Sequence, residues 1–426
     1  MILRQDDLYI NKIDWITILL YSLLVIIGWF NIYAAVYDGQ AAKSIFDFSI
    51  NSGKQLVWIG TAILLITVIM VADYRLFENL SLVLYGLFII ILLLTPFIGK
   101  EINGQRAWFE IGAFRLQPAE FAKFATALTL AKFLERPSID LSQFRYQWKA
   151  LGIIALPVAL IMLQPDTGTA MVYSAFLFML YREGMPQRYY VFGLTFVAVS
   201  LLALGIENNL ILVGAVVVIM VLLVIMGKIN WQRISFFTVI GLIIIAYSYS
   251  LDYVVSKLPS HQQNRIMVLF NPDIDPLGVG WNVTQSKIAI GSGGFIGKGY
   301  LEGTQTKFDF VPEQHTDFIF CTLGEEFGWI GSFIIVVLFV SLLIRLIMLA
   351  ERQKTRYARV YGYCVVSLLL FHFAINISMT IGLFPVVGIP LPFFSYGGSS
   401  LWSFTILLFI FIKLDSHRIQ MLDRMN

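Results

Sequence analysis

Charged residues are scarce in this sequence. Aspartate, glutamate, lysine and arginine make up 13% of its 426 residues, and 58% of the residues are hydrophobic. A soluble domain carries about 25% charged residues, so the composition argues against a soluble protein. Because apolar runs of about 20 residues, the length that crosses a bilayer, recur along the chain, the sequence predicts an all-α polytopic membrane protein.

Cysteine and histidine are also rare. The two cysteines, Cys321 and Cys364, both lie in apolar runs, which favours core residues over a disulfide framework. The four histidines are scattered, so no metal-ligand cluster is indicated, and no Gly-x-Ser-x-Gly nucleophile motif occurs. The net charge of +3 is too small to indicate a nucleic-acid partner.

Twelve apolar segments are expected to cross the membrane, and they lie at 15–37, 55–72, 79–97, 118–135, 148–164, 168–182, 189–205, 209–226, 233–251, 316–347, 357–384 and 395–414. Lysine and arginine gather in alternate short loops, which places both termini inside. Residues 1–14 and the tail 415–426 are therefore expected to be cytoplasmic. The first apolar run is long enough to remain as an anchor, so no cleavable signal is expected.

Three segments are then expected outside: a loop at 98–117, a long loop at 252–315 and a proline-rich turn at 385–394. A loop of more than 60 residues without secondary structure is unusual, so we expect the long loop to form secondary structure or to have a function. We expect an amphipathic helix over 282–290 and packing of the loop onto the outer face, where it forms part of a cavity. No separate soluble domain is apparent, so residues 1–426 form one predicted membrane domain.

A carboxylate, Asp317, lies at the beginning of a long apolar segment. A charge entering the membrane costs free energy, so such a residue usually has a structural or functional role. Thr316 or Asp317 could simply cap the helix that follows. We favour a functional role, because a glycine-rich, lysine-containing loop lies just upstream. Deeper in the same segment, Glu325 and Glu326 are expected to pair with intramembrane cations, with Lys123 as a candidate partner.

The upstream loop has five glycines between Gly291 and Gly299, after a segment that carries Lys287. Glycines let backbone N–H groups approach a ligand, so the loop could cradle a phosphate. A flexible surface loop is the alternative. The Gly-Lys-Gly sequence around Lys298 lacks the Ser or Thr of a nucleotide-binding P-loop. Lys287 and Lys298 could neutralise a diphosphate.

The stretch from residue 103 to 123 holds several weaker signals. Pro118 suits the first helical position, and Glu120 in that turn suits the helix dipole. Lys123 lies about one turn deeper, where a cation needs a partner or a wet cavity. Trp108 could be a membrane-interface residue or, beside Arg106, could stack on a sugar or flank a phosphate.

Two further segments have architectural explanations. Asp166, in a tight turn between two spans, is expected to cap the following helix. Three prolines stiffen the turn at 385–394, and the small residues at 395–400 allow helices to approach closely, so packing is as good an explanation as substrate contact. Asn376 in the preceding span is expected to form an interhelical hydrogen bond.

Together, and in this order, these segments resemble the SEDS family (shape, elongation, division and sporulation proteins), and most of all its rod-shape-determining members. The matching stretches are NGQRAWFEIGAFRLQPAEFAK, LQPDTGTA, QSKIAIGSGGFIGKGYLEGTQTKFDFVPEQHTDFIF, GEEFG and LFPVVGIPLPFFSYGGSS. The family typically has ten spans, so the twelve expected here imply a SEDS-type bundle with one inserted hairpin at 209–251.

The resemblance implies a peptidoglycan glycosyltransferase of the bacterial inner (cytoplasmic) membrane, with its active site on the periplasmic face. It would polymerise lipid II, a disaccharide-pentapeptide on undecaprenyl diphosphate, with a class B penicillin-binding protein and other membrane proteins of the elongation complex as partners. The family's essential aspartate falls on Asp317. The residues expected to bind substrate are Arg106, Trp108, Glu120, Lys123, Gln285, Lys287, Ser292, Lys298, His315 and Ser395.

As a general base, Asp317 would take the proton of the acceptor 4-hydroxyl as that oxygen attacks the donor sugar. A divalent cation, Mg²⁺ or Mn²⁺, could assist, but no dedicated protein site for one is indicated. Two other classes stay open. A lipid II flippase would also need many spans and intramembrane charges, although it should present binding groups to both faces. A non-catalytic scaffold would use Asp317 only as a cap.

Overall fold

The structure is a computed structural model that describes residues 13–37, 44–102, 104–112, 114–206, 209–225, 231–258, 260–271, 278–308 and 310–418. Most of the predicted cytoplasmic N-terminus and tail lies outside these residues, as does most of the basic turn of the predicted inserted hairpin.

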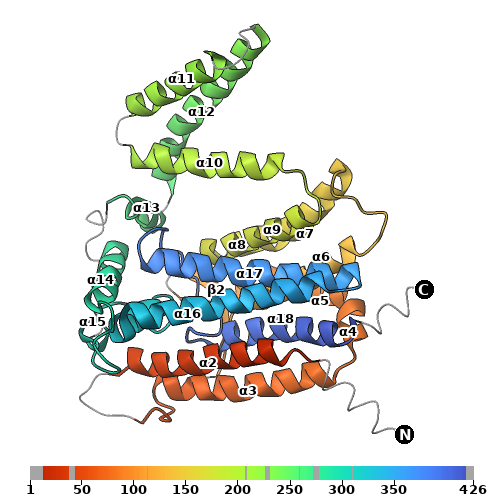
Figure 1. The fold of residues 1–426 in the computed structure, drawn as a ribbon, viewed down its shortest axis with the longest axis vertical. Coiled ribbons are helices and arrows are strands. Elements are labelled where there is room, and N and C mark those ends of the chain that lie inside the picture. The colour runs from red at the N-terminus through yellow and green to blue at the C-terminus, as the bar shows by residue number, and fades with distance from the viewer. Residues whose placement is uncertain are drawn as a thin grey trace. The chain divides into compact units, whose positions relative to one another are not determined.

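Helices make up most of the described chain (Figure 1). In chain order they are α2 (Trp15–Ala35), α3 (Asn51–Val71), α4 (Tyr74–Asn79), α5 (Ser81–Ile98), α6 (Pro118–Leu134), α7 (Phe144–Met162), α8 (Thr167–Val172), the 3-10 turn η1 (Tyr173–Ala175), α9 (Phe176–Arg182), α10 (Arg188–Gly205), α11 (Asn209–Ile225), α12 (Trp231–Lys257), α13 (Ser260–Met267), α14 (Val279–Ser292), α15 (Thr304–Lys307), α16 (Ile319–Glu351), α17 (Arg356–Thr380) and α18 (Gly398–Ser416).

Every predicted span coincides with one or more helices. Among the described residues, eight helices are long and apolar enough to cross a membrane: α2, α3, α5, α10, α12, α16, α17 and α18. The other four predicted spans, α6, α7, α8 to α9, and α11, are shorter, broken into pieces or less apolar. The prediction of a polytopic helical membrane protein is confirmed. The full count of twelve stays a prediction.

The chain divides into two compact units, one of residues 1–185 and 282–426 and one of residues 186–281. The second unit consists of α10 to α13, in which α12 packs against both α10 and α11. Its α11 and α12 correspond to the predicted hairpin. However, α12 continues to Lys257, so the predicted loop begins six residues later than expected. The single membrane domain stays a prediction.

In the first unit, α6 lies at the centre and contacts α5, α7, α17 and α18. All fourteen residues from Pro118 to Ala131 are buried, and a helix that is buried on all sides belongs to the core. Around it, α16 packs on α2 and α17, and α18 packs on α3 (Figure 1). The first turn of α6, which carries Glu120, and the first turn of α16, which follows Asp317, are therefore held by neighbouring helices on several sides.

The loop at 98–117 folds as a three-stranded antiparallel sheet, with β1 (Lys100–Ile102), β2 (Gln105–Ile111) and β3 (Phe114–Leu116). This sheet was not predicted from the sequence, because two of its strands have only three residues. Glu110 accepts hydrogen bonds from Lys100 at 2.5 Å and Arg115 at 3.1 Å. The bond from Lys100 contributes most to holding the pKa of the Glu110 carboxyl below its ordinary value.

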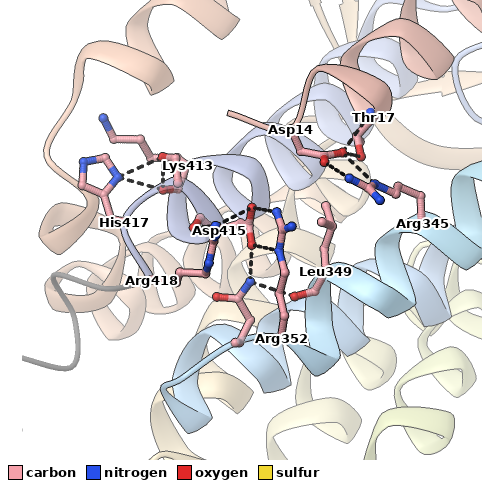
Figure 2. Close-up of polar contacts among 11 residues, drawn as sticks. Asp14, Thr17, Arg345, Leu349, Arg352, Lys413, Asp415, His417 and Arg418 are labelled. Carbon is pink, nitrogen blue, oxygen red and sulfur yellow. Dashed lines mark hydrogen bonds and ion pairs between the residues drawn. The ribbon is translucent and has the colours of Figure 1, made fainter. Parts of the chain in front are cut away.

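Two arginine–aspartate pairs fix the far end of α16 (Figure 2). Arg345 binds Asp14, the residue that caps α2, and Arg352 binds Asp415 of α18 through both carboxylate oxygens, at 2.9 and 2.5 Å. The Asp415 side chain is fully buried. Such bidentate pairs are geometrically specific. They anchor α2 and α18 to α16 at the end opposite Asp317.

Near its beginning α16 is broken at Gly328, whose φ of +62° is non-helical. The glycine-rich loop 291–299 lies against this break. Four backbone hydrogen bonds join the two: Lys298 N to Glu325 O at 3.1 Å, Gly299 N to Glu326 O at 3.0 Å, Trp329 N to Gly294 O at 2.9 Å, and Ile330 N to Phe295 O at 3.2 Å. A broken helix needs such partners, because unpaired backbone groups are costly within a membrane.

Candidate functional site

Asp317 lies two residues before α16 and is half-buried. The N-cap position of α16 is occupied by Phe318, and no side chain there bonds to the first turn. The interpretation of Thr316 or Asp317 as a helix cap is therefore wrong. The physical reason for this difference is that residues 311–318 form bends and turns, so the helix begins two residues after Asp317.

The backbone on either side of this carboxylate is held by long-range hydrogen bonds. The carbonyl oxygens of three consecutive residues, 315–317, each accept one: from Tyr396 N at 2.9 Å, from Ser395 Oγ at 2.6 Å and from Asn376 Nδ2 at 2.8 Å. We call these three bonds the carbonyl clamp. Because they come from α17 and from the segment before α18, they fix the path of the Asp317 backbone.

The segment 388–391, which belongs to the proline-rich turn predicted at 385–394, faces Asp317. A Cβ placed on Gly388 would lie 3.3 Å from Asp317 Oδ2, and the φ of +73° at Gly388 also favours glycine. Asn376 donates its second hydrogen bond to Ile389 O at 2.7 Å. Ser395 Oγ accepts from Leu391 N at 2.9 Å. The same two side chains thus hold both the Asp317 backbone and the turn that faces its carboxylate.

The three-stranded sheet is tied to the same region. Ser399 accepts a hydrogen bond from Gln117 N at 3.2 Å and donates one to Arg115 O at 3.0 Å. Arg106 lies on the sheet in an exposed ion pair with Glu101 at 3.0 Å. Trp108, on the same strand, is half-buried.

Glu120 and Lys123 form a buried ion pair at 2.8 Å, with 5% and 2% of their side chains exposed. The Lys123 ammonium also lies 3.0 Å from His372 Nε2 and 4.7 Å from the centre of the Phe404 ring. The expectation that Lys123 pairs with the glutamates of α16 is wrong. Glu120 lies three residues away on the same helix, which is a neighbouring position on its surface.

Glu325 has a different cation as its partner. Lys298 Nζ lies 2.6 Å from Glu325 Oε1, and the Glu325 side chain is fully buried. Its carboxylate also accepts backbone hydrogen bonds from residues 304–306 at 2.8 to 3.0 Å. Lys298 therefore shares its charge with a buried carboxylate. The backbone N–H groups of residues 297–299 bond to protein carbonyls, so these three groups support the protein backbone. A phosphate contact by the rest of the loop stays a prediction.

The predicted helix at 282–290 is confirmed as α14. Gln285 is buried, whereas Lys287 and Ser292 are exposed. Lys287 lies beside the turn that ends α17, since a Cβ on Gly382 would meet Lys287 Nζ at 3.6 Å. No carboxylate of the described residues lies within ion-pair distance of Lys287. Ser292 donates to Ala289 O of its own helix at 2.8 Å.

Two architectural predictions are confirmed. Asp166 caps α8 by accepting from Thr169 N at 3.0 Å, and Gln117 donates to its other oxygen at 2.7 Å. Pro118 occupies the first turn of α6. In the described part of the chain, no group of three or more His, Cys, Asp or Glu side chains could hold a metal ion. The assistance of a divalent cation stays a prediction.

A model of the cell cycle protein family of FtsW, RodA and SpoVE matches residues 14–206 and 187–420. The chain belongs to this family. It is 32% identical to the peptidoglycan glycosyltransferase RodA of Treponema pallidum, over 96% of this chain and 99% of that protein. It is 34% identical to the peptidoglycan glycosyltransferase MrdB of Escherichia coli K12, over 81% of this chain and 80% of that protein.

Solved structures of the FtsW/RodA/SpoVE family have the same fold. A chain of a peptidoglycan synthase complex, described as coordinating polymerization and crosslinking, matches with a TM-score of 0.70 and 27% identity, over 96% of this chain and 99% of that one. The rod shape determining protein RodA of Thermus thermophilus matches with a TM-score of 0.62 and 25% identity, over 95% and 97%. The predicted family is confirmed.

Sequence reasoning missed two residues of this site. His372 was grouped with scattered histidines, and Asn376 was expected only to bond between helices. A signal was present in the sequence: the two lie four residues apart in an apolar helix, so they share one face. Polar side chains that share a face within a membrane span indicate a functional site.

Proposed function

We propose that this chain is a peptidoglycan glycosyltransferase, which polymerises lipid II into glycan strands during cell elongation and rod-shape maintenance. The observation that carries the proposal is the geometry at Asp317. Asp317 is not the N-cap residue of the helix that follows, its backbone is held by the carbonyl clamp, and its Oδ2 lies near Gly388. A base whose backbone is held in one position is what proton abstraction from a bound hydroxyl requires.

In the proposed reaction, Asp317 accepts the proton of the acceptor 4-hydroxyl. That oxygen attacks the anomeric carbon of the donor sugar, and the bond from this carbon to the lipid diphosphate breaks. The donor linkage is α and the product linkage β, so one in-line displacement with inversion is sufficient. The proton stays on Asp317 until it is released to solvent.

The leaving diphosphate gathers negative charge, which cations can stabilise. Among the predicted substrate-binding cations, Lys123 and Lys298 are bound to buried carboxylates. Arg106 lies in an exposed ion pair, which is weak. Lys287 is exposed, and the ion pairs of the described residues do not include it. Lys287, followed by Arg106, is therefore our proposed contact for the diphosphate.

The chain is an integral membrane protein. We place it in the bacterial inner membrane, with Asp317 at the periplasmic face, because lysine and arginine in the alternate loops predict this orientation. Its proposed partners are a class B penicillin-binding protein and other membrane proteins of the elongation complex.

We also propose a test for Mg²⁺ or Mn²⁺, in which a chelator is added to the assay and each cation is restored singly.

Polymerisation of lipid II by the purified chain in detergent tests the proposal. A micelle has no second membrane face, so flipping cannot contribute to the signal. We expect glycan strands from the wild-type chain with its transpeptidase partner inactivated. Absence of product with and without the partner, alongside transport of lipid II across vesicle membranes, would favour the flippase. Absence of both activities would favour the scaffold.

Substitution of Asn376 by leucine tests the carbonyl clamp. The variant keeps the size of the side chain but removes both donors, so the carbonyls of Asp317 and Ile389 lose their partners. We expect kcat to fall about tenfold or more while KM changes little, because a misplaced base slows chemistry without weakening binding. Initial polymerisation rates at several lipid II concentrations measure both constants.

Asn31 provides the matched control. It is equally buried, and its Nδ2 donates to Ile319 O at 3.0 Å, two residues beyond Asp317. Asn376→Leu leaves two carbonyls without these partners, which costs about 1–3 kcal/mol for each carbonyl. Asn31→Leu removes an additional bond to Ile319 O, which still accepts its bond within α16. Both variants should therefore melt at lower temperatures. Only Asn376→Leu should lose turnover. Equal losses of kcat in the two variants would contradict a specific role for the clamp.

A further inference from the structure

A row of buried polar groups runs from α6 to the turn that faces Asp317. Glu120 Oε2 binds Lys123 Nζ at 2.8 Å, and Lys123 Nζ lies 3.0 Å from His372 Nε2. On the other side of the imidazole ring, His372 Nδ1 lies 3.2 Å from Pro390 O. His372 is 1% exposed. The Phe404 ring packs edge-on against the imidazole, with 4.7 Å between the ring centres.

The chemistry of these groups fixes the direction of each bond. An ammonium group donates hydrogen bonds and accepts none. His372 Nε2 must therefore be the acceptor of the bond from Lys123, and a neutral imidazole then carries its hydrogen on Nδ1. That hydrogen is donated to Pro390 O. The charged Lys123 thus selects the one tautomer of His372 that can hold the turn.

His372 and Asn376 act on adjacent carbonyls of this turn. They lie one helical turn apart on the same face of α17. His372 donates to Pro390 O, and Asn376 donates to Ile389 O and to Asp317 O. The Asp317 carboxylate faces Gly388, the next residue of the same turn. The buried ion pair on α6 is thereby connected to the catalytic carboxylate through two side chains of α17.

We propose that His372 is a positioning residue, through which the Glu120–Lys123 pair holds the turn at 388–390 against Asp317. This inference rests on the proposed function of Asp317. It also assigns Glu120 and Lys123 a role other than substrate contact. With 2% of its side chain exposed and its ammonium surrounded by Glu120, His372 and Phe404, Lys123 acts on the reaction through His372.

Two conservative variants separate the two bonds of His372. Asparagine places an amide N–H near the position of Nδ1, so His372→Asn keeps a donor for Pro390 O and loses the acceptor for Lys123. Glutamine reaches the position of Nε2, so His372→Gln keeps the acceptor and loses the donor to the turn. His372→Ala removes both. Each variant is purified in full length with the partner present, and its melting temperature, kcat and KM for lipid II are measured.

We expect His372→Ala and His372→Gln to lower kcat about tenfold or more with KM nearly unchanged. His372→Asn should restore kcat to within about threefold of the wild type. Lys123→Met should also lower kcat, and combining it with His372→Ala should cause little further loss, because residues that act in one network are not additive.

Four results would overturn the inference. These are a kcat within about twofold of wild type for His372→Ala, an unchanged kcat with a raised KM, no rescue by asparagine, and full additivity with Lys123→Met. The variants His372→Asn and His372→Gln keep the test valid if the alanine variant does not fold. Failure of the proposed function is recognised separately, because an active Asp317→Asn enzyme would reject Asp317 as the base whatever the His372 variants do.

Discussion

Substitution of Gly293 by alanine is expected to prevent normal folding of the chain. A Cβ at this position would overlap the carbonyl oxygen of Gly324 and would meet that of Glu325 at 2.9 Å. Both obstacles are backbone atoms of α16, so a side-chain rotation cannot relieve the overlap. Overpacking costs about 1–3 kcal/mol, occasionally more, and we expect a cost at the upper end or beyond.

The substitution would also disturb the region of Asp317, because the loop after α14 forms backbone hydrogen bonds across the break in α16. If α14 moves away from α16, the backbone bonds from residues 298 and 299 to residues 325 and 326 weaken. The Lys298–Glu325 ion pair then loses its geometry, and a buried carboxylate without its partner is strongly destabilising. The first turn of α16, which follows Asp317, depends on this arrangement.

Gly291 is the matched control, because it lies two residues earlier in α14 and a Cβ there would meet nothing within 4 Å. Gly291→Ala should leave folding unchanged or slightly improve it, since alanine is the better helix former. The yield of monodisperse protein and the melting temperature in detergent measure the difference. A Gly293→Ala protein that is as stable as Gly291→Ala would contradict the close packing of the turn after α14 on α16.

The membrane fold could be predicted because its signal is strong at most of the predicted spans. Apolar runs of about 20 residues mark helices directly, and Pro118 and Asp166 mark helix beginnings by local chemistry alone. The sheet at 100–116 carried no comparable signal. Strands of three residues are too short for a pattern of alternation, and the bonds that pair them join residues that only the fold brings together.

The glycine-rich loop shows where a sequence pattern has two meanings. Glycines allow a backbone to approach a phosphate, but equally another backbone. In this chain the loop contacts another backbone, because the break at Gly328 leaves backbone groups of α16 that the loop binds. The partner of Lys298 followed from the same contact. From sequence, Lys123 was the candidate partner for the glutamates of α16, and Lys298 was a candidate to neutralise a diphosphate.

Asp317 could be found from sequence because a carboxylate beside an apolar run is unusual. The groups that hold it could not. The carbonyl clamp involves backbone atoms of 315–317, and backbone atoms have no sequence identity. His372 and Asn376 were visible only as polar residues in an apolar helix. Their meaning depends on the turn at 388–391, which lies beside them only in the folded chain.

Replacement of Asp317 by asparagine is expected to abolish glycan synthesis. Asparagine has nearly the same shape, but its amide cannot take a proton from the acceptor hydroxyl. The contribution of a positioned general base is about a hundred- to ten-thousand-fold in rate, so the variant should fall below detection in an ordinary assay. The clamp binds the backbone carbonyl of Asp317, so the substitution leaves that bond in place.

Asp317→Glu separates the charge from its position. Glutamate keeps the carboxylate but extends it by one methylene toward Gly388. The space there is narrow, because a Cβ added to Gly388 would lie 3.3 Å from Asp317 Oδ2. We expect partial activity at most, because a base that is displaced by about 1 Å loses about a hundredfold in rate. Recovery of full activity with glutamate would indicate that the carbonyl clamp does not position the base.

The central claim is that this chain carries out the transfer reaction with Asp317 as its base. The most direct measurement is the initial rate of lipid II polymerisation by wild-type and Asp317→Asn proteins, purified side by side in one detergent with their melting temperatures recorded. We predict glycan strands from the wild type, none from the variant, and equal melting temperatures. Normal glycan strands from a folded Asp317→Asn protein would contradict the account.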